Sequence, residues 1–168
     1  YHVRGNATYS YTQPDYTGTH MPQHNVESIL KSRGIIPEVI KSYGVTSRML
    51  DNGTYVVASP VCDESGQQVS EHFRSVDTAT GELTRQMFYT KGTKLSNGLF
   101  GVEKIRKSTK IVLVCEGITD TLSSASKLYS NKDVAVVGLL GVAHAKKAAA
   151  HLTIYAHNKT IVLALDND

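Results

Sequence analysis

The chain has 168 residues, of which 40% are hydrophobic and 20% are charged, with a net charge of +3. This composition is typical of a folded globular chain and excludes one that is disordered throughout. No apolar run approaches the roughly 18 residues that a membrane-spanning helix needs, so we expect no membrane partner. The two cysteines, Cys62 and Cys115, both lie in apolar, β-branched surroundings. That setting predicts reduced core thiols, and neither a disulfide framework nor a zinc site.

The first third of the chain changes from polar to helical character. Residues 1–25 show no helical or strand period, which predicts a linker or an extended tail. Residues 26–50 predict two short helices. An i, i+3, i+4 apolar stripe begins at Val26, Gly34 supplies a C-terminal signal, and Pro37 suits the first turn of the second helix.

The middle of the chain has strand character. The residues at 54–60, 68–74 and 86–89 predict three strands, and the turn-forming residues at 63–66 and 80–82 separate them. Short strands joined by tight turns favour an antiparallel arrangement.

The pattern then changes to unbroken apolar strands that alternate with helices. The strands are predicted at 111–115, 134–137 and 161–165, and the helices at 119–129 and 143–156. Strands without polar alternation indicate a parallel sheet that is covered on both faces.

Acidic side chains follow two of these strands. Glu116 and Asp120 come after the first strand, and Asp166 and Asp168 come after the third. Functional groups of parallel sheets gather at the carboxyl ends of the strands, so the four carboxylates should meet at one rim. Carboxylates without His or Cys partners suit a hard cation such as Mg²⁺, which points to phosphoryl chemistry.

These motifs together resemble a known family. The run from Ile111 to Asp120, followed by Asp166-Asn167-Asp168, looks like the Toprim signature of primases, topoisomerases and some nucleases. The flanks, among them Ser32-Arg33-Gly34-Ile35 and Leu99-Phe100-Gly101, are similar to the primase part of phage bifunctional primase–helicases, to which the mitochondrial Twinkle helicase is related. The resemblance covers roughly residues 26–168.

The resemblance implies a fold and an organisation. We expect a linker at 1–25, an α+β N-terminal primase subdomain of short helices and antiparallel strands at 26–108, and an α/β Toprim fold with a parallel sheet at 109–168. The Toprim fold is expected to be truncated at its C-terminal end, so that the chain is a fragment of a longer protein. No zinc ribbon and no Walker loop are present in the sequence, so zinc and the helicase motor are expected only in absent modules.

The resemblance also implies an activity. The parent protein would be a nucleotidyltransferase that makes RNA primers for DNA replication, using Mg²⁺, ribonucleoside triphosphates and a single-stranded DNA template. It would also be a helicase and NTPase, hexameric through the absent helicase domain, in the cytoplasm of the infected bacterial host. The isolated fragment is expected to have little activity.

The family pattern assigns a role to individual residues. Glu116 would be a metal ligand or a general base, Asp166 and Asp168 would bind Mg²⁺, and Asp120 would be a further acidic position beside the site. The cations expected to hold template or nucleotide phosphates are Arg74, Lys91, Lys94, Lys146 and Lys147.

Other interpretations remain open at this point. The cations can also be ordinary solvated charges, and Asp120 can also serve the first turn of a helix. At the level of function, the alternatives are another Toprim enzyme, such as a nuclease or a topoisomerase, or a non-catalytic Toprim nucleic-acid-binding module of a Twinkle-like helicase.

Overall fold

The computed structural model describes residues 24–93 and 95–165, and the predicted linker lies almost wholly outside them. The helices are α1 (Val26–Lys31), α2 (Pro37–Ser42), α3 (Ile118–Lys127) and α4 (Ala145–Tyr155), with short 3-10 turns η2 (Val102–Lys104) and η3 (Val142–His144). The strands are β1 (Thr46–Met49), β2 (Tyr55–Cys62), β3 (Gln68–Val76), β4 (Leu83–Tyr89), β5 (Leu99–Phe100), β6 (Ile111–Cys115), β7 (Val134–Leu139) and β8 (Thr160–Ala164).

The first sheet is antiparallel, in the order β1-β2-β3-β4. It confirms the three strands predicted in the middle of the chain and adds β1 ahead of them. The helices α1 and α2 precede this sheet, as their apolar stripes and the proline at the start of α2 predict. These elements form the expected α+β arrangement.

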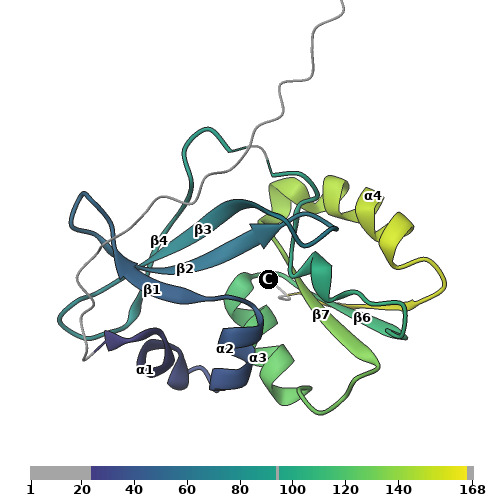
Figure 1. Ribbon diagram of the computed structural model, residues 1–168, viewed down its shortest axis with the longest axis horizontal. Coiled ribbons are helices and arrows are strands. Elements are labelled where there is room, and N and C mark those ends of the chain that lie inside the picture. Colours follow the sequence, from purple (N-terminus) through teal and green to yellow (C-terminus); the bar gives the residue numbers. More distant parts are fainter. Residues whose placement is uncertain (1–23, 94, 166–168) are drawn as a thin grey trace, which may run out of the picture.

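The second sheet has the order β5-β7-β6-β8, in which β7, β6 and β8 are parallel and β5 is antiparallel. Alternate residues of β6 and β7 face opposite sides. Val112 and Val114 pack with Ala148 and Leu152 of α4, whereas Val136 packs in the core that includes α3. Figure 1 shows α3 and α4 on opposite sides of β6 and β7. The apolar runs of β6 and β7 are therefore covered on both faces, as predicted. The prediction is wrong for β8, whose five residues are all exposed because it lies at the edge of the sheet.

One hydrophobic core joins the two sheets. It includes Leu30 of α1, Tyr55 of β2, Phe100 of β5 and Leu122 of α3. The expected boundary between residues 108 and 109 stays a prediction, and β5, which precedes it, pairs with β7 on the other side.

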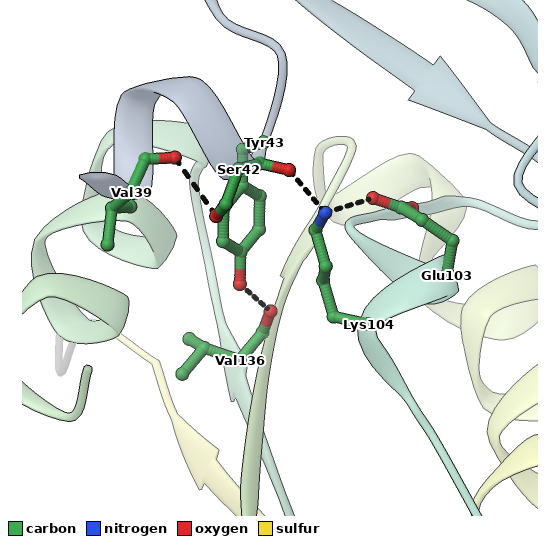
Figure 2. A network of polar contacts seen from close by, with 6 residues as sticks. All are labelled: Val39, Ser42, Tyr43, Glu103, Lys104 and Val136. Atoms are coloured by element: carbon green, nitrogen blue, oxygen red, sulfur yellow. Dashed lines mark hydrogen bonds and ion pairs between the residues drawn. The ribbon is translucent and has the colours of Figure 1, made fainter. Parts of the chain in front are cut away.

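Polar contacts fix α2 against the second sheet (Figure 2). The hydroxyl of Tyr43 donates a hydrogen bond of 2.7 Å to the carbonyl oxygen of Val136 in β7. Lys104 donates to the carbonyl oxygen of Ser42 and lies 3.3 Å from the Glu103 carboxylate. These contacts hold the end of α2 beside the parallel strands. The carboxyl ends of those strands point towards the antiparallel sheet (Figure 1).

Candidate active site

A cleft of about 440 Å³ lies between the antiparallel sheet and the carboxyl ends of β6 and β7. One wall is formed by the loop after β6 and the first turn of α3, residues 116–120, together with residues 139–142 after β7. The facing wall comes from the antiparallel sheet. Its lining residues are Val57, Ser59, His72, Arg74, Leu83, Met87 and Tyr89.

The acidic wall is built by a tight turn from β6 into α3. Glu116 is half-buried, Gly117 precedes the helix, and Asp120 lies exposed in the first helical turn. A side chain on Gly117 would come within 2.9 Å of Oδ2 of Asp120, so the Asp120 carboxylate turns back over the backbone beside Glu116. No side-chain hydrogen bond caps α3. The N-cap residue is Gly117, and Asp120 is the acidic residue of the first turn, where its charge also favours the helix N-terminus.

A second glycine brings β7 close to this turn. An added Cβ at Gly138 would lie 2.3 Å from Oγ1 of Thr121 and 3.2 Å from the carbonyl oxygen of Gly117. Thr121 is fully buried and donates a hydrogen bond of 2.7 Å to that same carbonyl oxygen. Glycine at 138 thus allows α3 to begin directly against β7, which fixes the direction of the acidic wall.

The facing wall follows from strand register. His72 and Arg74 are two residues apart on β3, so their side chains share one face of the sheet. Their neighbours across the strands are Tyr89 and Met87 on β4. The His72 and Tyr89 rings meet edge to face, with 5.1 Å between their centroids. The Tyr89 hydroxyl donates a hydrogen bond of 2.8 Å to the carbonyl oxygen of Leu140. This wall offers a fixed aromatic and apolar floor.

Arg74 brings positive charge to the floor of the cleft. Its Nε donates a hydrogen bond of 2.8 Å to the carbonyl oxygen of Thr84, which orients the guanidinium. Burial lowers the pKa of Arg74, the like charge of Arg33 lowers it further, and Asp120 acts in the opposite direction. Arg74 therefore lies within electrostatic range of the Asp120 carboxylate on the other wall, and also of Arg33.

The remaining predicted residues are placed differently. Lys91 lies exposed in the turn after β4, and Lys146 and Lys147 lie exposed in the first turn of α4. None of these three lines the cleft. Lys94, Asp166 and Asp168 lie outside the described residues. The strand that leads to the two aspartates, β8, pairs in parallel with β6, with Ala164 opposite Cys115.

The donor set of the acidic wall fits a hard cation. Glu116 and Asp120 offer only carboxylate oxygens, which is the ligand type that Mg²⁺ prefers. Within residues 24–93 and 95–165 there is no cluster of three or more His, Cys, Asp or Glu that could hold a metal alone. A pair of carboxylates matches the way Mg²⁺ is usually held, by one or two carboxylates together with water and substrate phosphates.

Three lining or neighbouring residues were missed as site residues in the sequence. Arg33 belongs to the run Ser32-Arg33-Gly34-Ile35, which served only as evidence of family resemblance. His72 and Tyr89 were interpreted as ordinary strand residues. Side chains two residues apart on a strand lie on the same face, so His72 could have been predicted as a neighbour of Arg74. Arg33 has no such signal, because it lies in the turn after α1 and a contact with a distant segment places it, the hydrogen bond that Ser123 of α3 donates to its carbonyl oxygen.

Comparisons with known proteins agree with this architecture. Residues 113–168 match the Toprim-like family. The chain also matches the crystal structure of the primase fragment of the bacteriophage T7 primase-helicase protein at 26% identity and a TM-score of 0.67. That match covers 95% of this chain and 63% of the T7 fragment. The chain thus carries a Toprim-like domain and matches the fold of the T7 primase fragment over most of its length. No curated protein sequence matches it.

Further solved primases share this fold. A chain from a bacteriophage T7 complex, in which lagging-strand DNA polymerase interacts with primase domains bound to an RNA/DNA hybrid and dTTP, matches at 27% identity and a TM-score of 0.66. It covers 82% of this chain and 65% of that one. The Aquifex aeolicus primase matches in fold alone, at 19% identity and a TM-score of 0.62, over 83% of this chain and 42% of its own. The chain thus spans just under two thirds of the T7 chains that it matches.

Proposed function

We propose that the cleft is the active site of a DNA primase, which joins ribonucleotides into RNA primers on single-stranded DNA in a Mg²⁺-dependent reaction. The observation that carries this proposal is that Glu116 and Asp120, at the end of β6, line one wall of the cleft and Arg74 of the antiparallel sheet lines the facing wall. The T7 chain in complex with an RNA/DNA hybrid and dTTP supports the same substrate class.

The residues of the cleft divide the work of nucleotidyl transfer. Arg74, and Arg33 near it, would hold triphosphate or template phosphates, because guanidinium groups bind phosphate oxygens in pairs. The floor made by Met87, Tyr89 and His72 would receive a base, since aromatic rings stack on bases regardless of sequence. Glu116 would bind the metal or accept the proton of the attacking 3′-hydroxyl.

The metal belongs to the same wall. Glu116 would hold it, with Asp166 and Asp168 as the further ligands that we propose from the sequence. A bound Mg²⁺ would neutralise the charge of the triphosphate and lower the pKa of the attacking hydroxyl. Asp120 would add negative potential beside this site and thereby strengthen its attraction for the cation. We propose that Lys91 and Lys94, and less directly Lys146 and Lys147, extend the phosphate contacts outside the cleft.

The wider setting of the reaction is also proposed. The T7 protein whose primase fragment matches is named a primase-helicase. We propose by analogy a phage replication protein whose other part is a hexameric helicase and which acts in the cytoplasm of the infected bacterium. Among the described residues, none of the helices is long and apolar enough to cross a membrane.

Labelled ribonucleotide incorporation on single-stranded DNA tests the proposal. Glu116→Gln keeps the size of the side chain and removes its charge, so we expect primer synthesis to fall by about 100-fold or more. The control is Glu38→Gln, an exposed glutamate in the first turn of α2, which should leave synthesis unchanged. The assay uses the parent protein, and the 168-residue chain is tested beside it for Mn²⁺ binding by titration calorimetry.

The same assays separate the alternatives. DNA cleavage without incorporation would identify a nuclease or topoisomerase. Equal incorporation by Glu116→Gln and the wild type, or equal Mn²⁺ binding by both, would remove Glu116 from the site.

A further inference from the structure

A strongly basic hollow lies at the opposite end of the parallel sheet from the cleft. It is formed by the loop before β6, residues 105–110, and by the end of α4 with the loop into β8, residues 155–160. Its volume is about 960 Å³. Its charged lining residues are Arg106, Lys107, Lys110, His157 and Lys159.

The charge of this hollow is one-sided. Four lysines and arginines line it and no Asp or Glu does, so this one surface holds more positive charge than the net +3 of the whole chain. Arg106 and Lys107 are exposed and have no ion-pair partner among the described residues. Lys110 pairs with Asp133 at 2.8 Å, but both side chains are at least half exposed, so water weakens that pair.

The hollow is preformed by its own hydrogen bonds. The turn at its edge closes through a bond from the Thr109 amide to the Arg106 carbonyl oxygen and one from the Arg106 amide to Oγ1 of Thr109. Lys159 reaches across from the other loop and donates to the carbonyl oxygens of Lys107 and Thr109, at 3.3 and 2.6 Å. The two loops are therefore tied to each other, which fixes the backbone from which the cations extend and lowers the entropy cost of ordering the loops on binding.

The basic surface continues around the end of the sheet. A second hollow shares Arg106, Ser108 and Thr109 with the first and adds Tyr129 and Lys132. Tyr129 is 45% exposed, and Nζ of Lys132 lies 4.8 Å from the centroid of its ring. We call this surface the basic band, made of Arg106, Lys107, Lys110, Lys132, His157 and Lys159. A track of cations with aromatic rings between them is what single-stranded nucleic acid requires.

We propose that the basic band binds the phosphate backbone of single-stranded nucleic acid, as a contact separate from the catalytic cleft. Lys110 and Glu116 lie at the two ends of β6 and are six residue steps apart, which places the two sites on the order of 20 Å apart. A free nucleotide would occupy one hollow only, whereas a strand can follow both. The binding does not depend on the proposed active site, because it uses cations at the other end of the sheet.

Fluorescence anisotropy with a labelled oligothymidylate tests the proposal on the 168-residue chain. Arg106→Gln/Lys107→Gln removes two charges that make no side-chain contact within the described structure. The slope of log K against log salt concentration falls by about 0.7 in magnitude for each phosphate contact that is lost. We therefore expect a slope smaller by about 1.4 in the double variant, and binding about 20-fold weaker near 0.1 M salt. The matched control, Lys31→Gln/Lys41→Gln, removes two charges from α1 and α2 and should bind like the wild type. Equal losses in both variants, or no loss in the first, would overturn the proposal.

Two further measurements locate the contact and identify the partner. Bound oligothymidylate should slow the acetylation of Lys107 several-fold and leave Lys41 unaffected, and unprotected Lys107 would contradict the proposal. Polyglutamate should displace the labelled oligothymidylate poorly when compared with unlabelled oligothymidylate of equal charge. Equal displacement by both would indicate an acidic protein partner instead. Glu116→Gln should bind the oligonucleotide as well as the wild type does. For the wild-type protein, oligonucleotide binding at these cations without primer synthesis would count against the proposed function alone, and primer synthesis without that binding would count against the basic band alone.

Discussion

His72 shows how one buried residue can make stability depend on pH. Burial, and then the nearby charge of Arg74, lower its pKa from 6.5 to about 4. The unfolded chain therefore binds more protons than the folded chain between about pH 4 and 6.5, and the free energy of unfolding falls as the pH falls through this window. Between pH 7 and pH 5, His72 alone should cost about 2 kcal/mol.

Urea denaturation at these two pH values measures this effect. His72→Gln keeps a neutral polar side chain and should lose about 2 kcal/mol less than the wild type between pH 7 and pH 5. His157→Gln is the matched control, because His157 is exposed. If the His72→Gln variant and the wild type lost the same free energy, the imidazole would titrate normally. NMR should show the His72 ring remaining neutral at pH 5.

The residues of the cleft also show how far a sequence can define a site. Glu116 and Asp120 could be predicted, because they follow an apolar strand and parallel strands end at one rim. Arg74 was found only through family resemblance. Arg33 could not be predicted, since its place depends on how the turn after α1 contacts Ser123 of α3, 90 residues away in the chain. Contacts between distant segments leave no local period.

At the scale of elements, the approach of α3 to β7 depends on Gly138. A methyl group there would overlap Oγ1 of Thr121 and press on the Gly117 carbonyl oxygen. We expect Gly138→Ala to lower the free energy of unfolding by about 3 kcal/mol, because a packed core tolerates added volume poorly. Adding Thr121→Ala to Gly138→Ala should restore part of that loss, since it removes the atom that is struck. Urea denaturation of both single variants and the double variant gives the coupling energy, and additive losses would contradict the contact.

The elements that the sequence predicted and those it did not differ in length and in burial. α3 and α4 were predicted because ten or more residues repeat a period, and β6, β7 and β8 because an unbroken apolar run covers each strand. α1 and α2, of six residues each, were predicted from an apolar stripe together with signals at their ends, Gly34 and Pro37. β1 has only four residues, Thr46-Ser47-Arg48-Met49, and β5 has two, so neither can show a period. Both are defined by their partners. β1 pairs with β2, and β5 pairs with β7 across the expected domain boundary.

At the scale of the whole molecule, β8 forms an apolar edge of the second sheet. All five of its residues are exposed, and the exposed fractions of Ile161, Val162 and Leu163 are 42%, 42% and 65%. β8 pairs only with β6 in the described sheet, so one side of its backbone has no strand partner there. An exposed edge with apolar side chains on both faces favours pairing with another chain.

We therefore expect the 168-residue chain to self-associate through β8, with a mass that rises with concentration in sedimentation experiments. Leu163→Lys places a charge at the middle of this edge and should keep the chain monomeric, because a lysine on an edge strand opposes pairing. Ile154→Lys is the matched control, since Ile154 is also 65% exposed but lies on α4. Association that persists in Leu163→Lys and disappears in Ile154→Lys would move the contact from the sheet edge to the helix. A monomeric wild type would show that the exposed edge alone is too short to hold two copies together.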